Sequence, residues 1–477
     1  MRLTVLLLAA CTAAPPAAGP RVALSPCRLK GSGIPAQCGT LRVPEDRAHP
    51  QGRHIDLRVA VIPALARDPA PDPLFLLAGG PGQAATEAFG PLLGAFERVR
   101  RTRDLVLVDQ RGTGSSNPLR CDPIAPDATL AERLKTNTLD VAKFKECLRG
   151  YDADPRFYTT AIAMQDLDEV RAALGYAQIN LWGGSYGTRA ALVYLRDHAP
   201  SARSAVLDGV APPQLILPLN FAQDAQRSID LLFSQCEADA ACARTFPNLS
   251  QRFNRLLAEL ESNPKKAKVQ DPRTGAVSEV TIGRTAFASG VQNILYQQDL
   301  ASLVPLIVDR ASDGEFGPFV AAVASFEQAR GLSTGMTFSV ACAEDLRGVT
   351  EAEAKEAAKG TFLGPTIAES FLRICSFWPR GDAPPRAAIH SDAPVLLFSG
   401  ELDPATPPRW ADIAAQTLPN SRKFVVPGVG HGTVAEGCVP RLIDQFLQKP
   451  DPAALDASCL APLKRPPFFV SFAGPTP

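Results

Sequence analysis

The segment that most constrains the fold is a glycine-rich turn between an apolar run and a helix-compatible run. Residues 179–182 read Ile-Asn-Leu-Trp, residues 183–187 read Gly-Gly-Ser-Tyr-Gly, and residues 188–198 have helical character. Glycines two positions either side of a serine allow a sharp turn that projects the hydroxyl above a sheet edge. We therefore predict a strand, a strained turn and a helix, with Ser185 as a nucleophile; a chance match in a glycine-bearing loop is the alternative.

Short apolar runs, each closing on a glycine- or aspartate-containing turn, recur along the chain with helix-compatible stretches between them. This rhythm is typical of a mostly parallel sheet with helices on both faces. Because right-handed crossovers bring the carboxyl ends of parallel strands to one edge, we expect the functional loops there. The predicted strands are 55–62, 74–78, 105–109, 179–182, 205–208, 395–399 and 423–426.

The chain has 477 residues, which is too long for one ordinary domain, since domains usually have about 100–200 residues. A long stretch of helical character, including 222–238 and 351–360, separates the last two predicted strands from the others. Alternating residues around Asp-Pro-Arg-Thr-Gly also predict a hairpin at 267–282. We predict a core formed by residues 21–210 and by 391–477, the second part with a C-terminal extension, and an inserted, largely helical cap at 211–390.

A serine hydroxyl needs a base, and the base needs an orienting acid. His431 lies between glycines just past the final predicted strand, where small neighbours leave its ring free to reach the serine; His390 is the alternative base. Asp403 follows the preceding strand and is favoured over Glu401, which fits a solvated turn. The chain order Ser185, Asp403, His431 is that of the α/β-hydrolase fold, which we predict with the cap inserted before the acid-bearing strand.

Acyl transfer also needs hydrogen-bond donors for a tetrahedral oxyanion. The predicted strand at 74–78 ends in Gly-Gly-Pro-Gly at 79–82, where a backbone without side chains can approach a substrate oxygen. We assign the oxyanion hole to the amides of Gly80 and Tyr186. Read alone, the Gly-Gly-Pro-Gly segment is only a turn.

The N-terminus carries one positive charge followed by an apolar run too short to span a bilayer. Residues 1–20 therefore form a predicted signal peptide, and Leu-Ala-Ala-Cys at 8–11 resembles the lipobox of bacterial lipoproteins, in which Cys11 is lipidated. Ordinary cleavage within 13–19 is the alternative. We expect export to the periplasm or the extracellular space, with no membrane span but a possible lipid anchor at Cys11.

The chain has 11 cysteines, so ten remain after Cys11, an even number suited to bridges in an oxidising compartment. A zinc site is the competing interpretation, but no C-x-x-C pair supplies its spacing, and we expect no metal or other cofactor. The predicted pairs join sequence neighbours: Cys27–Cys38, Cys121–Cys147, Cys236–Cys242, Cys342–Cys375 and Cys438–Cys459.

The charge balance argues against a nucleic-acid partner. Lys plus Arg and Asp plus Glu both number 49, so the formal net charge is zero, and no basic block interrupts the sequence. Hydrophobic residues make up 45% and charged residues 21%, an ordinary globular balance.

These residues resemble the prolyl aminopeptidase and tripeptidyl aminopeptidase family of serine exopeptidases, over most of the mature chain. The resemblance implies hydrolysis of short peptides from a free N-terminus, with a helical cap that restricts access. Ala78 stands where prolyl aminopeptidases typically have histidine, which favours the tripeptidyl branch. The matching segments are 41–46, 79–82, 109–116, 183–187, 342–345 and the loops of Asp403 and His431.

An exopeptidase must bind the substrate ammonium with carboxylates. Glu344 and Asp345, which follow a cysteine predicted to be bridged, are our candidates, and Glu87 is a weaker one. Asp109 and Arg111, at the end of a predicted strand, fit better as braces for neighbouring loops.

The sequence therefore predicts an exported serine exopeptidase that acts on peptides through an acyl-enzyme on Ser185. A carboxylesterase for small esters is the main alternative, because the same residues cleave both bonds. A catalytically silent binding protein on the same fold is a second alternative, although such proteins usually lack part of the triad. The sequence leaves the oligomeric state open.

Overall fold

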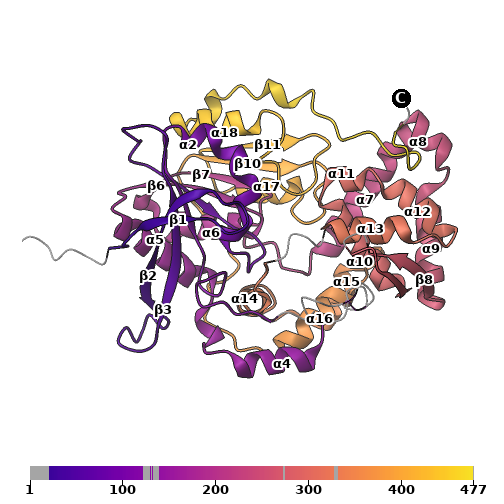
Figure 1. The fold of residues 1–477 in the computed structure, drawn as a ribbon, viewed down its shortest axis with the longest axis horizontal. Coiled ribbons are helices and arrows are strands. Elements are labelled where there is room, and N and C mark those ends of the chain that lie inside the picture. The colour runs from indigo at the N-terminus through magenta and orange to yellow at the C-terminus, as the bar shows by residue number, and fades with distance from the viewer. Residues whose placement is uncertain are drawn as a thin grey trace, which may run out of the picture.

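A nine-stranded sheet organises the chain, with strand order β1-β2-β3-β5-β4-β6-β7-β10-β11 (Figure 1). The structure is a computed structural model and describes residues 21–475 except 122–128, 130–131, 133–138, 272–273 and 327–330; the predicted signal peptide and Cys11 lie outside the described residues. The strands are β1 (Ser25–Arg28), β2 (Pro35–Pro44), β3 (His54–Ile62), β4 (Leu74–Leu77), β5 (Leu105–Val108), β6 (Ile179–Gly184), β7 (Ala202–Asp208), β10 (Val395–Gly400) and β11 (Ser421–Val426).

In the spatial order of the sheet, every neighbouring pair of strands from β5 to β11 is parallel. The strands β1, β2 and β3 extend the sheet beyond β5 and pair antiparallel, with β3 next to β5. The mostly parallel sheet of the α/β-hydrolase fold is therefore confirmed, and each of the predicted strands is present. β1 and β2 were not predicted. They form an edge hairpin whose residues Cys27 and Cys38 are joined by a disulfide.

Helices cover both faces of this sheet. Strand side chains alternate between the faces, so that in β4 Phe75 and Leu77 pack beneath α5, α6 and α17, while Leu74 and Leu76 pack beneath η1, α2 and α18. The helical elements of this part are α1 (Ala85–Ala88), η1 (Gly90–Phe96), α2 (Glu97–Arg100), α4 (Val141–Gly150), η2 (Pro155–Phe157), α5 (Thr160–Leu174), α6 (Tyr186–Asp197), η3 (Ala199–Ser201), α17 (Pro408–Ala415), α18 (Val439–Gln448), η5 (Pro452–Ala454) and η6 (Ser458–Leu460).

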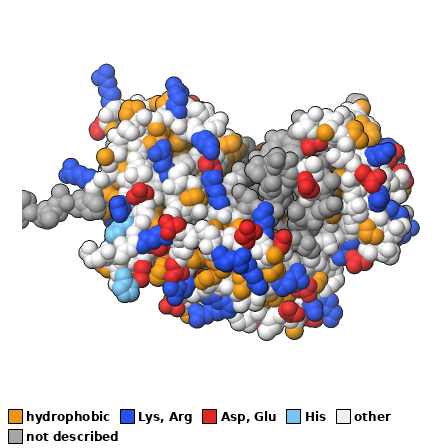
Figure 2. Space-filling view, turned by 60° about the horizontal axis from the view of Figure 1, so that its bottom comes forward, with side chains coloured by type: hydrophobic (Ala, Val, Ile, Leu, Met, Phe, Trp, Pro, Cys, Tyr) orange, Lys and Arg blue, Asp and Glu red, His pale blue; other side chains and the backbone are white. Residues whose placement is uncertain are grey.

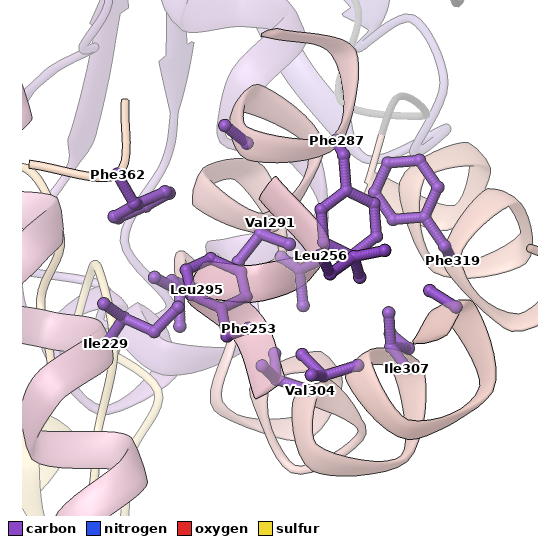
Figure 3. Packing of buried hydrophobic residues seen from close by; sticks show 14 of the residues in the cluster. Ile229, Phe253, Leu256, Phe287, Val291, Leu295, Val304, Ile307, Phe319 and Phe362 are labelled. Carbon is purple, nitrogen blue, oxygen red and sulfur yellow. The ribbon is translucent and has the colours of Figure 1, made fainter. Parts of the chain in front are cut away.

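Between β7 and β10, a group of helices builds a separate apolar core, shown in Figure 3, where Phe253, Phe287 and Phe319 meet from three different helices. The predicted hairpin is present as β8 and β9, which pair antiparallel. The elements are α7 (Phe221–Ala238), α8 (Ala240–Thr245), α9 (Leu249–Ser262), β8 (Lys265–Gln270), β9 (Val277–Ile282), α10 (Arg284–Leu295), α11 (Gln298–Ala301), α12 (Val304–Ser312) and α13 (Gly317–Phe326).

The last helices before β10 pack instead against α4 of the core, through a cluster that contains Phe144, Phe338 and Trp378. Residues 211–390 thus divide into a helical group with its own core and a second group that packs against α4. The second group consists of α14 (Thr334–Val340), the π-helical turn η4 (Ala341–Asp345), α15 (Glu351–Ala357) and α16 (Thr366–Cys375).

All the predicted disulfide pairs are formed, and they are of the kind found in exported proteins. The C-terminal segment crosses from the core to the cap (Figure 1), where Phe468 joins the cap core and Phe469 N–H donates to Ser302. On the face shown in Figure 2, acidic and basic side chains are intermixed over the coloured surface.

Candidate active site

The serine turn has the geometry that its sequence predicts. Ser185 follows β6 and precedes α6, with φ 55° and ψ −124°, a positive φ that non-glycine residues seldom adopt. A methyl group at Gly183 would lie 2.3 Å from the carbonyl oxygen of Gly187, and one at Gly187 would lie 2.2 Å from that of Leu77. Only glycine therefore permits this close approach of strand, turn and helix, which lifts Ser185 out of the sheet.

Asp403 and His431 are brought together from loops after β10 and β11. Asp403 Oδ2 lies 2.8 Å from His431 Nδ1, and Thr406 Oγ1 donates to the same carboxylate oxygen at 2.8 Å. The amides of Ala405 and Thr406 donate to Oδ1, each at 2.8 Å. An ionised carboxylate only accepts hydrogen bonds, so Nδ1 carries the proton and Nε2 has its lone pair available.

The ionisation of both groups follows from this pairing. Burial alone would raise the pKa of Asp403, but the His431 ring and the amides of Thr406 and Ala405 hold that pKa below its ordinary value. Burial alone would lower the pKa of His431, but the carboxylates of Asp403 and Asp208 bring it above its ordinary value. The imidazolium form of His431 is thus stabilised by its surroundings.

Ser185 and His431 both contact the residues that end β7. Ser185 N–H donates to the Asp208 carbonyl at 2.9 Å, and a methyl group at Gly209 would lie 3.3 Å from His431 Cε1 and 3.6 Å from Asp403 Oδ2. Gly209 also has a positive φ of 69°. A side chain is therefore disfavoured there both by this backbone conformation and by the nearby His431 ring. The three predicted residues therefore surround one short segment, Asp208-Gly209.

The loop after β4 lies directly beside Ser185. A methyl group at Gly79 would lie 3.2 Å from Ser185 Cβ, and one at Gly80 would lie 2.8 Å from the Gly82 nitrogen. Tyr186 is the first residue of α6, so its amide has no acceptor within the helix. The loop that carries Gly80 and the first turn of α6, with Tyr186, therefore lie on either side of Ser185; their role as an oxyanion hole stays a prediction.

Neighbouring elements brace this loop and the short helix α1 that follows it. Ser333 N–H donates to the Gly82 carbonyl at 2.9 Å and Thr337 Oγ1 to the Pro81 carbonyl at 2.6 Å. Asp109 accepts from the amide and the hydroxyl of Thr86 at 2.9 Å and 3.0 Å. Asp109 is therefore a brace, as the sequence predicts.

Arg111 has the same kind of role. Its guanidinium is fully buried, pairs with both oxygens of Asp166, and donates to the carbonyl groups of Pro44, Glu45 and Phe157. It ties β2 to α5.

Glu344 and Asp345 have different partners from those that the sequence predicts. Asp345 is fully buried and accepts from Arg189 Nη1 at 2.8 Å and from the Leu217 amide at 3.2 Å. Glu344 accepts from the amide and the hydroxyl of Thr160 at 2.6 Å and 2.8 Å. Asp345 thus pairs with Arg189 of α6 through Oδ1, and Glu344 pairs with Thr160 at the start of α5. The prediction that Glu344 and Asp345 bind a substrate ammonium stays a prediction, although the burial of Asp345 beside Arg189 does not favour it.

Replacing Asp345 with asparagine should destabilise the fold by about 3–5 kcal/mol, because removing one partner of a buried ion pair leaves the other charge uncompensated. The check is the urea unfolding midpoint. Asp412→Asn, which breaks an exposed pair with Lys423, is the control and should have a much smaller effect. Equal shifts for the two variants would contradict the assignment.

The sequence analysis missed two groups that complete the site. Asp208 accepts from the Thr433 amide at 2.9 Å and 2.8 Å and from its hydroxyl at 3.0 Å, which holds the His431 loop. The sequence does contain a signal for Asp208, because an aspartate stands at the end of a predicted core strand there, as Asp109 does at the end of another. Tyr296, at the end of α10, has no comparable signal in the sequence. Its backbone carbonyl accepts from the backbone N–H of His431 at 2.8 Å, and its ring packs edge-on against the imidazole.

Among the described residues, no group of three or more His, Cys, Asp or Glu side chains has an arrangement that could hold a metal ion. Within the same part of the chain, no helix combines the length and the apolar character that crossing a membrane requires.

Comparison with known proteins gives consistent results. Residues 360–459 match a family described as TAP-like protein. The serine protease Hip1 of Mycobacterium tuberculosis is 26% identical over 485 residues, covering 91% of this chain and 90% of that protein. The tripeptidyl aminopeptidase of Streptomyces lividans is 31% identical over 194 residues, 38% of this chain and 36% of its own length. Carboxylesterase B of M. tuberculosis is 27% identical over 457 residues, 86% of this chain and 84% of that protein.

The sheet order, the serine turn and these relatives together define a serine hydrolase of the α/β-hydrolase fold. More particularly, the chain carries a TAP-like domain and is homologous to a serine protease and to a tripeptidyl aminopeptidase. The resemblance found in the sequence is confirmed, and the disulfides indicate that the protein is exported.

Proposed function

We propose that this protein is an exported serine exopeptidase that releases short peptides or single residues from free N-termini, with Ser185, His431 and Asp403 as its catalytic triad. The observation that carries the proposal is the pairing of the buried Asp403 with His431, with Oδ2 2.8 Å from Nδ1. Both His431 and the serine turn lie against Asp208-Gly209. A base oriented in this way is what a serine hydroxyl needs in order to attack a carbonyl.

In the first half of the reaction, Ser185 Oγ attacks the carbonyl carbon of the scissile amide and its proton passes to His431 Nε2. The imidazolium that forms is stabilised by Asp403, whose carboxylate accepts from Nδ1. The tetrahedral oxyanion accepts hydrogen bonds from the amides of Gly80 and Tyr186. The C–N bond then breaks, the proton moves from His431 to the leaving amine, and the N-terminal part of the substrate remains as an ester on Ser185.

In the second half, His431 takes a proton from water, and the resulting hydroxide equivalent attacks the ester carbonyl. The same two amides stabilise the second oxyanion. The C–O bond to Ser185 breaks, the serine regains its proton from His431, and the released peptide leaves as a carboxylic acid.

The carboxylate that binds the substrate ammonium is, in this proposal, Glu87 and not Asp345. Glu87 lies in α1, shortly after the 79–82 loop, and its side chain is 28% exposed. Its ion pair with the Nζ of the exposed Lys30 is long, 3.8 Å, whereas Asp345 pairs with a buried cation. A methyl group at Gly331 would lie 3.3 Å from Glu87 Oε2. The next residue, Leu332, reaches over Gly80 and is partly exposed. Glu87 and Leu332 thus lie beside the loop that carries Gly80.

Glu87→Gln should raise KM for unblocked peptides about tenfold while kcat changes little, because it removes a charge-assisted hydrogen bond to the ammonium group. Steady-state kinetics on an unblocked tripeptidyl chromogenic substrate measure this. Glu97→Gln in α2, an exposed glutamate on a neighbouring helix, is the matched control. An unchanged KM, or an equal rise with a small ester, would refute the role of Glu87.

The experiment that tests the proposed activity compares unblocked peptides, N-blocked peptides and p-nitrophenyl esters on the purified protein. We expect turnover of unblocked peptides to exceed that of blocked ones. Esters alone, or blocked peptides at equal rates, would overturn the proposal. Esterase activity is the second candidate because carboxylesterase B is similar over most of its length.

We also propose that residues 1–20 direct export and that Cys11 is the lipidated first residue of the mature protein. The support is the Leu-Ala-Ala-Cys sequence at 8–11 and the even number of bridged cysteines that remains. Mass spectrometry of the mature N-terminus decides between a diacylated Cys11 and cleavage within 13–19.

A further inference from the structure

We infer that Asp208 is a positioning residue for His431, which both fixes the loop that carries the base and places a second negative charge beside the imidazole. The inference rests on the proposed function, because it concerns the base of the proposed triad. It adds a carboxylate to the three residues that the sequence motifs identify.

The geometry begins with complete burial. Asp208 is the last residue of β7 and its side chain is shut off from solvent, 1% exposed. Both carboxylate oxygens are directed at Thr433, two residues after His431, and accept from its amide and its hydroxyl at 2.8–3.0 Å. Hydrogen bonds to a buried carboxylate are charge-assisted and therefore hold the loop firmly.

The same residue also contacts the nucleophile, since its carbonyl accepts from Ser185 N–H at 2.9 Å. Asp208 thus joins the serine turn and the His431 loop through one residue, with Gly209 against the imidazole edge. A displacement of the base relative to the serine would have to break these bonds.

The charge acts on the base directly. His431 faces Asp403 and Thr406 from the loop after β10, Tyr296 from the end of α10, and Asp208 from β7. Burial raises the pKa of Asp208 to about 6, although bonds from Thr433 and the nearby His431 oppose this rise. Near neutral pH the Asp208 carboxylate is therefore ionised, and it favours the imidazolium that forms when Ser185 attacks.

The test measures the pH dependence of the rate at which a fluorophosphonate labels Ser185, in the full mature chain. The reagent needs the serine and the base but no peptide specificity. The rate rises as His431 loses its proton, so the acid limb of the profile reports the pKa of His431. Removing a negative charge lowers that pKa, and the limb moves to lower pH.

Asp208→Asn keeps the shape of the side chain and an acceptor for Thr433, and should move the acid limb down by about one pH unit. Thr433→Val, which removes only the hydroxyl donor, raises the pKa of Asp208 and should give a smaller shift in the same direction.

Asp224→Asn is the control. Asp224 is equally buried and its pKa is also raised to about 6 by burial, but its partners are Arg409 and Trp410; it should leave the limb in place.

Acid limbs of Asp208→Asn and Thr433→Val that coincide with that of the unaltered protein would overturn the inference and leave the proposed function standing. If Asp208→Asn does not fold, Thr433→Val alone decides, because the amide bonds to Asp208 remain. Failure of the unaltered, folded protein to label at Ser185 would overturn the proposed function, and the inference with it.

Discussion

Ser185→Ala is expected to lower kcat by roughly 10⁶-fold, the size of effect known for loss of the serine in subtilisin. No other group can replace its Oγ, because the strained turn at φ 55° places this one side chain above the sheet beside Gly79. The variant should fold normally and bind substrate with little change in affinity, since the amides of Gly80 and Tyr186 remain. Kinetics on an unblocked peptide, with a thermal melt in parallel, measure both quantities.

Ser399→Ala is the control for this variant. Ser399 lies in β10, is fully buried, and its hydroxyl has no hydrogen-bond partner among the described residues. The control should retain activity. Residual turnover above about one per cent in Ser185→Ala would mean that another nucleophile performs the reaction.

Asp403→Asn is expected to lower kcat by about 10⁴-fold, as the corresponding change does in chymotrypsin-like proteases. Asparagine can present an N–H group to His431 Nδ1, which then becomes an acceptor. The proton moves to Nε2, and the ring can no longer accept the proton of Ser185. The fold should survive, because the remaining oxygen still accepts from the amides of Ala405 and Thr406.

Asp412→Asn makes the same chemical change at an exposed site on α17, soon after the loop of Asp403, and should not alter kcat.

Glu401→Gln distinguishes the two acidic residues of the Asp403 loop. Glu401 accepts from the Gly428 amide at 2.8 Å, so its loss should reduce activity far less. A larger loss from Glu401→Gln than from Asp403→Asn would show that the wrong acid has been assigned.

The sequence predicted the parallel strands well because each is a short, continuous apolar run bounded by turn residues, as strands buried on both faces must be. β1 was missed because it has only four residues, Ser25–Arg28, which are partly or fully exposed. β2 begins and ends in proline and has Gly39 in its middle. The pairing of these two strands depends on contacts with β3 and on a disulfide, which no local pattern reveals.

The candidate triad could be predicted because each member lies at a strand end in a recognisable turn. The partners of Asp345 could not. Arg189 is 156 residues away along the chain, and only the packing of η4 against α6 brings the two charges together. A motif that places two carboxylates side by side says nothing about which cations already neutralise them.

Asp208 was missed for a related reason. An aspartate at the end of a strand fits an exposed turn as well as a buried anchor, and the choice depends on where the loop of Thr433 runs. Tyr296 lies in the inserted cap, and its contact with His431 is made through a backbone carbonyl, which any residue type could provide. Sequence patterns therefore predict the candidate triad more readily than the groups that hold it.

The most direct test of the account is mass spectrometry of the protein after reaction with a fluorophosphonate, with the adduct located by peptide sequencing. The account predicts one adduct, on Ser185, and none in a folded His431→Ala variant over the same time. An adduct on a different serine, or undiminished labelling without the histidine, would contradict the central claim that His431 activates Ser185.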